Sequence, residues 1–226
     1  MKKFLLNFLC ICVIFSLTGC SREEKYTIKD KLDSETEYIE NLIFKIVIKH
    51  AKGEYEEEGK INWDYIKGDI NKINSSWNLM IIDLSTVGVE NKEILQYSDD
   101  LNNLLLSIAN NDELTMIDKL NSIYKKIIDF RDVYSDNKNE IEKNRIKSSI
   151  LNSYYFANIM QYENGKIDID KTIEKYKELM KNDDYKKENN YNLNKIYILL
   201  QEYRNSFNTG ELDLIKLKFI LTIEEL

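Results

Sequence analysis

The sequence predicts an all-α protein, an antiparallel up-and-down bundle of about six to eight helices. Two observations carry this prediction. The 226 residues include no proline and only 7 glycines, the residues that a helix interior tolerates least and that an all-β chain needs in its turns. Apolar residues also recur at steps of three and four along most of the chain, which is the period of a helix with one buried face. Short connections between such helices favour antiparallel neighbours.

Residues 1–19 have the layout of a secretory signal. Lys2 and Lys3 precede an apolar run, which is shorter than the ~20 residues of a membrane span and ends in small residues before Cys20. The end of this segment, Leu-Thr-Gly-Cys at 17–20, resembles the lipobox of bacterial lipoproteins. The resemblance implies cleavage before Cys20 and a diacylglycerol on its thiol, whose two acyl chains suffice for a durable anchor. A plain signal peptide, or an anchor helix with Cys20 unmodified, is the alternative.

Cysteine usage and charge exclude several classes of function. Cys10 and Cys12 lie in the segment to be discarded and Cys20 receives the lipid, so the mature domain has no thiol for a disulfide, a nucleophile or a metal. The net charge is −7 and becomes more negative once Lys2 and Lys3 are removed. A chain of this charge is repelled by phosphate backbones, so no nucleic acid is expected as a partner. No motif indicates a cofactor.

The mature chain is expected to begin with a polar tether over 20–33, followed by a helical domain over 34–226. Ser34 and Glu37 have the spacing of a capping box, and helical periodicity then continues to Ala51. After an acidic loop, a second helix is marked by Trp63, Ile66, Ile70, Ile73, Trp77, Met80 and Leu84 and ends near Gly88. This stripe spans only about three heptads and is widened by further apolar residues, which favours packing inside a bundle over a coiled-coil dimer.

The rest of the chain repeats the same pattern. Apolar spacing predicts helices over about 94–108, 114–134, 146–161, 170–180 and 193–207. Asn111 or Asp112 is expected to cap the helix over 114–134, and Gly165 is expected to end the helix over 146–161. After Gly210 the spacing fits a strand or a helix, and we prefer a helix because a lone strand has no ladder partner. The segments 34–134 and 140–226 form either one bundle or two packed halves.

Few residue types indicate a site. The only histidine, His50, is followed by an acidic loop, so His50, Glu54, Glu57 and Glu58 are the candidates for a metal site, although the preferred interpretation is a helix-end histidine beside solvated acids. Tyrosine is abundant, with 15 copies, and a tyrosine surface can stack on sugars or grip a peptide. The candidates for partner or ligand contact are Tyr154, Tyr155, Tyr162 and Tyr191, and the alternative is that they fill half-buried helix edges.

These observations predict a non-catalytic lipoprotein on the extracytoplasmic face of the bacterial cell membrane. Cys20 and the composition resemble the small lipoproteins of low-GC Gram-positive bacteria. The expected partner is another protein of the cell envelope, and the membrane is contacted through the lipid on Cys20. The alternative is a protein that captures a metal ion or small ligand for a transporter. No nucleophile motif or phosphate-binding loop is recognisable, so an enzyme is not expected.

Overall fold

The computed structural model describes residues 27–189 and 192–226, and the chain forms an antiparallel helical bundle. Nine helices lie within these ranges: α2 (Ile28–Ala51), α3 (Trp63–Thr86), α4 (Asn91–Ala109), α5 (Glu113–Tyr134), α6 (Lys138–Asn158), α7 (Tyr162–Leu179), α8 (Asp183–Asn189), α9 (Leu193–Ser206) and α10 (Leu212–Glu225). A two-residue hairpin of β1 (Glu56–Glu57) and β2 (Lys60–Ile61) pairs Glu56 with Ile61 between α2 and α3. The all-α prediction is confirmed.

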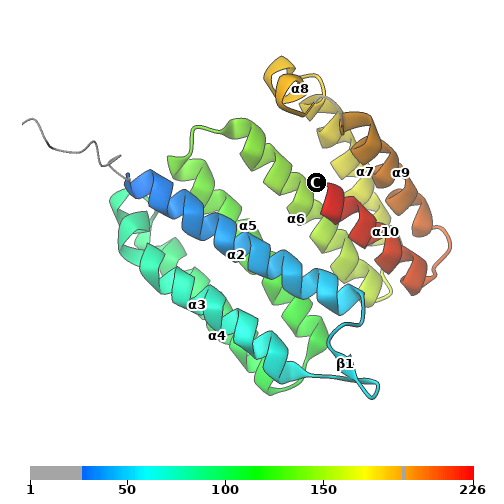
Figure 1. The fold of residues 1–226 in the computed structure, drawn as a ribbon, viewed down its shortest axis with the longest axis horizontal. Coiled ribbons are helices and arrows are strands. Elements are labelled where there is room, and N and C mark those ends of the chain that lie inside the picture. The colour runs from blue at the N-terminus through cyan, green and yellow to red at the C-terminus, as the bar shows by residue number, and fades with distance from the viewer. Residues whose placement is uncertain (1–26, 190–191) are drawn as a thin grey trace, which may run out of the picture.

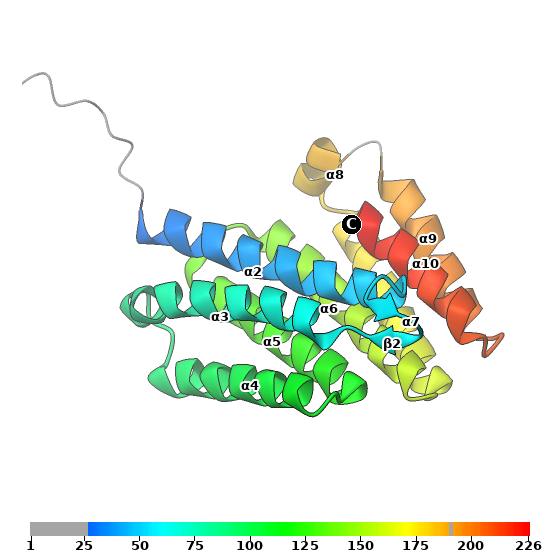
Figure 2. The same cartoon turned by 60° about the horizontal axis from the view of Figure 1, so that its bottom comes forward.

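The helices form two rings of four that lie side by side. In the first ring each of α2, α3, α4 and α5 packs on the next and α5 returns to α2; in the second, α6, α7, α9 and α10 do the same and α10 returns to α6. Figure 1 shows the first ring on one side and α7, α9 and α10 on the other, and Figure 2 shows α4 beneath α3 on the side away from α2. The rings meet where α5 packs on α6 and α2 on α10.

Ion pairs show that neighbouring helices run antiparallel. Lys31 pairs with Asp83 near one end of α2, and Lys45 pairs with Asp69 near the other end, so α2 and α3 run in opposite directions. The same order reversal joins α9 to α10, through the pairs Lys195–Glu225 and Lys218–Glu202. Buried apolar side chains from both rings make one continuous core. The two rings therefore share a single interior.

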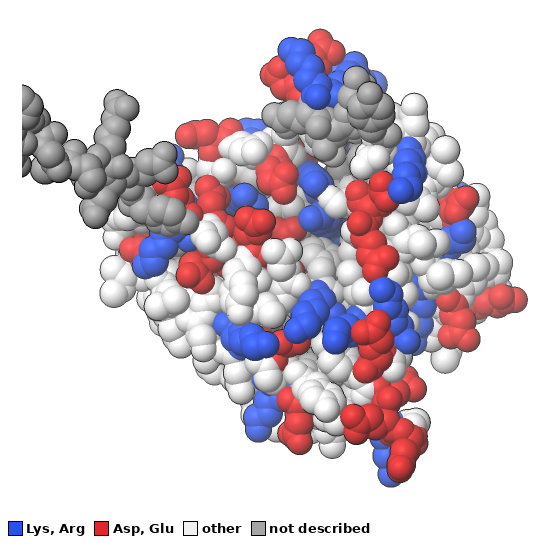
Figure 3. Space-filling model, in the orientation of Figure 1, with Lys and Arg blue, Asp and Glu red and all other residues white. Residues whose placement is uncertain are grey.

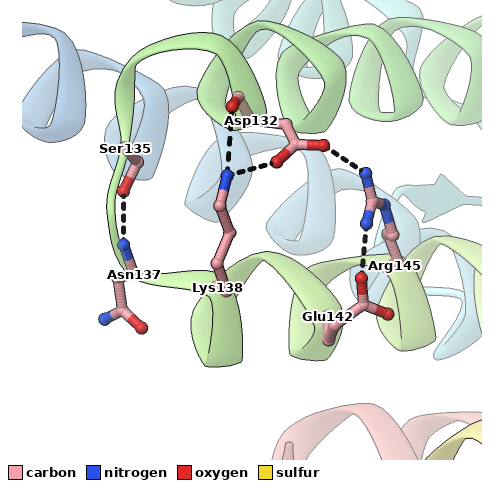
Figure 4. A network of polar contacts seen from close by, with 6 residues as sticks. All are labelled: Asp132, Ser135, Asn137, Lys138, Glu142 and Arg145. Atoms are coloured by element: carbon pink, nitrogen blue, oxygen red, sulfur yellow. Dashed lines mark hydrogen bonds and ion pairs between the residues drawn. The ribbon is translucent and has the colours of Figure 1, made fainter.

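The turn between the rings is fixed by polar contacts around Asp132 (Figure 4). Lys138 donates to the Asp132 carboxylate at 2.7 Å, and Arg145 donates to its other oxygen at 2.6 Å. The Ser135 hydroxyl accepts a hydrogen bond from the backbone N–H of Asn137 at 3.3 Å, while the Asn137 side chain caps α6. Hydrogen bonds from Lys138 and Arg145 lower the pKa of Asp132 despite partial burial. These contacts hold the last turn of α5 against the first turns of α6.

The first helix begins earlier than the sequence predicted. Thr27 caps α2, because its hydroxyl accepts from the N–H of Asp30 while Asp30 accepts from the N–H of Thr27. The expected capping box at Ser34 is therefore wrong. Leu32, placed in the tether from sequence, is fully buried. Residues 1–26, with the expected signal, Cys20 and the remainder of the tether, lie outside the described ranges.

Gly165 does not stop a helix. The helix predicted over 146–161 corresponds to α6, which ends at Asn158. Met160, two residues later, has a positive φ of 59°, and Gly165 lies inside α7. A Cβ at Gly165 would overlap the ring of Phe207, so glycine permits the close approach of α7 to the end of α9. The helix α8 lies between the helices predicted over 170–180 and 193–207 and was not predicted. The prediction of a helix after Gly210 is confirmed by α10.

The described ranges contain no helix of the length and apolar character that a membrane crossing requires.

Candidate functional site

His50 lies near the end of α2 and is buried between the two rings. Its Nδ1 is 2.9 Å from the Tyr154 hydroxyl, and its Nε2 is 2.7 Å from Oε1 of Glu113. Tyr154 comes from α6, and Glu113 is the first residue of α5. The Tyr154 ring stacks in turn on Phe219 of α10, with ring centroids 4.3 Å apart. One histidine therefore joins α2, α5 and α6 where the rings meet.

The electrostatics of this junction favour an ionised Glu113. The hydrogen bond from His50 lowers the pKa of Glu113, and burial opposes this effect only in part. Burial raises the pKa of the Tyr154 phenol well above its ordinary value, so the hydroxyl stays protonated at neutral pH. The arrangement is a hydrogen-bonded clamp inside the protein, with His50 only 6% exposed.

The acidic residues predicted beside His50 do not contact it. Glu54 pairs instead with Lys49 at 3.8 Å, and Glu57 and Glu58 are exposed in the hairpin. Both ring nitrogens of His50 are already bonded to Tyr154 and Glu113. Among the described residues no three His, Cys, Asp or Glu side chains lie close enough to hold a metal ion. The structure thus does not assemble the four candidate metal ligands into a site.

The candidate tyrosines do not form one contact surface among the described residues. Tyr154 is a fully buried core residue, which corrects the expectation that it contacts a partner. Tyr155 and Tyr162 are half-buried, and Tyr191 lies outside the described ranges. Tyr162, at the start of α7, lines a shallow pocket with Met160 and Phe207. The alternative interpretation, tyrosines that fill half-buried helix edges, describes Tyr155 and Tyr162 better, whereas Tyr154 is more deeply buried than either interpretation expected.

A groove that the sequence did not predict lies between α2, the hairpin loop and the first turns of α3. We call it the Asp69 groove. Its volume is about 410 Å³ and its lining is Lys45, Lys49, Glu54, Tyr55, Asp64, Tyr65, Gly68, Asp69 and Lys72. Figure 3 shows Lys and Arg side chains gathered in a row where the end of α2 passes α3, with acidic side chains beside them. The volume is within the range of small-ligand sites, roughly 300–1,000 Å³.

Asp69 lines this groove, and the residue is only 6% exposed. It accepts hydrogen bonds from Lys45 at 3.0 Å and from Lys72 at 2.7 Å. Burial alone would raise the pKa of Asp69, but these two hydrogen bonds outweigh it and hold the pKa below its ordinary value. The carboxylate is therefore charged at neutral pH, beneath two half-exposed ammonium groups.

Tyr55 provides the second buried polar group of the groove. Its side chain is 4% exposed, and its hydroxyl has no hydrogen-bond partner among the described residues. The ammonium group of Lys49 lies over its ring, 5.7 Å from the centroid. Burial raises the pKa of the Tyr55 phenol, and the nearby Asp69 and Glu54 carboxylates raise it further. Tyr55 thus brings to the lining of the groove a protonated, buried hydroxyl without a hydrogen-bond partner among the described residues.

Comparison with protein-family models finds no match. Searches among curated proteins and among solved structures likewise find no protein similar to this chain.

Sequence reasoning missed Asp69, Tyr55 and Glu113, although one of them left a signal. Asp69 lies between Ile66 and Ile70 on the apolar stripe of α3, and a charge in such a stripe must be buried with a partner. Glu113 is 63 residues from His50, and no local pattern connects them. Tyr55 lies in an acidic loop without apolar periodicity, so no pattern marked it as buried.

Gly68 is one of the residues that line the Asp69 groove. We expect Gly68→Ala to stabilise the protein. A Cβ at this helical position would meet nothing within 4 Å, and alanine is favoured over glycine in a helix interior by about 1 kcal/mol. The free energy of unfolding, measured by urea denaturation, should rise by about 0.5–1 kcal/mol. Gly165→Ala is the matched control and should lower it, because the added methyl group meets Phe207. A loss of stability in Gly68→Ala would contradict this assignment.

Proposed function

We propose that the protein is a lipid-anchored, non-catalytic binding module on the extracytoplasmic face of the bacterial cell membrane, and that its partner is a protein of the cell envelope. The observation that carries the proposal is the lipobox-like Leu-Thr-Gly-Cys at 17–20, after a basic start and an apolar run. The helical domain begins soon afterwards, at the capping box of Thr27. A lipid on Cys20 confines the domain to the membrane surface and raises its effective concentration against partners there.

The outward face of α3 supports a protein partner. Ile82 is 78% exposed and Leu79 is 56% exposed. Tyr38 of α2 lines the same shallow groove as Leu79. Neighbouring apolar side chains that remain exposed in a folded domain are typical of protein contact surfaces.

Substitution of Cys20 tests the anchor. We expect the wild-type chain to be recovered with the membrane fraction, and its intact mass to show loss of residues 1–19 together with a diacylglyceryl group on Cys20. Cys20→Ser should abolish the lipid and release the chain from the membrane fraction or leave it as an uncleaved precursor. Cys10→Ser and Cys12→Ser, in the same segment, are matched controls and should behave as wild type. An unmodified Cys20 in the wild-type protein would contradict the proposal.

A second candidate function, capture of a small ligand for a transporter, is favoured by the Asp69 groove. Its buried carboxylate, buried unpaired hydroxyl and converging lysines are features of a binding site with a few fixed polar groups.

A further inference from the structure

We propose that the Asp69 groove binds the oxyanion group, a carboxylate or phosphate, of a small polar metabolite. The groove is lined by Lys45, Lys49 and Lys72, whose ammonium groups are donors, by Tyr55, whose hydroxyl can donate, and by three carboxylate side chains, Glu54, Asp64 and Asp69. Only one buried acceptor, Asp69, lies among them. This inference rests on the second candidate function, ligand capture, and is independent of lipid attachment to Cys20.

The lysines retain donors after they have bonded to Asp69. An ammonium group has three N–H donors, and Lys45 and Lys72 each direct a donor to the same carboxylate. Their side chains remain 43% and 53% exposed, so the other donors face the groove or solvent. Two cations held about one carboxylate leave a local positive charge beside Asp69, while the ammonium group of Lys49 is paired with Glu54 at 3.8 Å. An oxygen anion bound above Asp69 would receive charge-assisted hydrogen bonds.

The Tyr55 hydroxyl offers a bound ligand one hydrogen-bond donor. A buried hydroxyl without a partner costs about 1–3 kcal/mol of unmade hydrogen bonding. Since its raised pKa keeps the phenol protonated, it can donate one hydrogen bond to a bound oxygen. Ligand binding would thus satisfy a group that is buried and unpaired in the free protein.

The residues at the rim of the groove indicate which chemical groups the rest of the ligand carries. Glu54 and Asp64 are exposed there and repel additional negative charge, so they suit hydroxyl or amine groups on the far side of the ligand. Tyr65, 62% exposed, offers a flat apolar ring beside them. A volume of about 410 Å³ exceeds what one inorganic anion fills, so the ligand is expected to be a larger metabolite.

An NMR titration of the purified full-length chain tests this assignment. Inorganic phosphate and succinate are added separately, and the amide signals of Tyr55, Gly68 and Asp69 are followed. We expect saturable shifts at these residues with at least one probe, with a dissociation constant of about 1 mM or lower. The probe that binds more tightly distinguishes a phosphate site from a carboxylate site.

Two variants separate binding from folding. Tyr55→Phe removes only the unpaired hydroxyl, so the free energy of unfolding should not fall while the affinity falls about tenfold or more. Gly68→Leu fills the groove without changing any charge and should abolish saturation. The double variant Lys177→Gln and Lys181→Gln removes two exposed, ion-paired lysines of α7 and serves as the matched charge control, with affinity unchanged.

Either of two results would overturn the proposal. One is the absence of saturable shifts at the groove with both probes. The other is binding that persists in Gly68→Leu and Tyr55→Phe but weakens in the α7 control, which would indicate general attraction of anions to lysine. Neither result bears on the lipid anchor, which the mass of the Cys20 peptide tests separately.

Discussion

Replacement of Trp77 by alanine is expected to lower the free energy of unfolding by about 3–5 kcal/mol, the usual cost of truncating a buried aromatic residue. The Trp77 ring is 1% exposed and lies 4.1 Å from the ring of Tyr97 and 6.0 Å from that of Phe130, measured between centroids. Its Nε1 donates to the Ser98 hydroxyl at 3.0 Å. The substitution therefore removes contacts that join α3 to α4 and α5, together with one hydrogen bond.

Trp63, the other tryptophan of the chain, is the matched control for Trp77. It is the first residue of α3 and only partly buried against the core. Trp63→Ala should cost less than half as much, because the side chain buries less apolar area. Urea denaturation followed by circular dichroism measures both variants without depending on tryptophan fluorescence. Equal losses in the two variants would contradict the larger contribution expected of Trp77.

Replacement of His50 by alanine should lower the free energy of unfolding by about 2–4 kcal/mol at neutral pH. It removes two hydrogen bonds at once and leaves Glu113 and the buried Tyr154 hydroxyl without this partner. Tyr154→Phe removes only one of these hydrogen bonds while keeping the ring against Phe219. This variant should therefore lose about 1 kcal/mol.

The destabilisation caused by His50→Ala should depend on pH through Glu113. The folded-state pKa of Glu113 lies below its ordinary value of 4.5, so the folded state binds fewer protons than the unfolded state in this range. The stabilisation is complete above about pH 4.5 and is lost as the pH falls through the folded-state value. The difference between wild type and His50→Ala should accordingly be largest at neutral pH and shrink in acid. A difference that grows below pH 4.5 would contradict the Glu113 contact.

The sequence predicts most helices because their signals are local. The stripe from Trp63 to Leu84 defined α3, and Asp112 caps α5 through the N–H of Thr115, as one of the two expected capping residues. The prediction that Gly165 ends a helix was wrong for a physical reason. Glycine is unfavourable in a helix, yet here it is required because the Phe207 ring occupies the place of a side chain. That requirement arises only when α7 and α9 pack.

The candidate sites were less accessible from sequence than the fold. His50 was selected correctly as an unusual residue, but its partners were sought among neighbours in the chain. Tyr154 lies 104 residues away and reaches His50 only when α6 packs on α5 and α2. The Asp69 groove likewise combines the end of α2 with the start of α3. Periodicity identifies buried faces, but it does not specify which polar residues of different helices meet.

The length of α2 has a consequence for where binding takes place. The helix runs without interruption from Ile28 to Ala51, which at 1.5 Å per residue is about 36 Å. The Asp69 groove lies beside its far end, whereas residues 21–26, which connect Cys20 to Thr27, can span no more than about 25 Å. If Cys20 carries the proposed lipid and α2 stands away from the bilayer, the groove opens well beyond the lipid head groups. It would then sample solutes of the surrounding medium rather than the membrane itself.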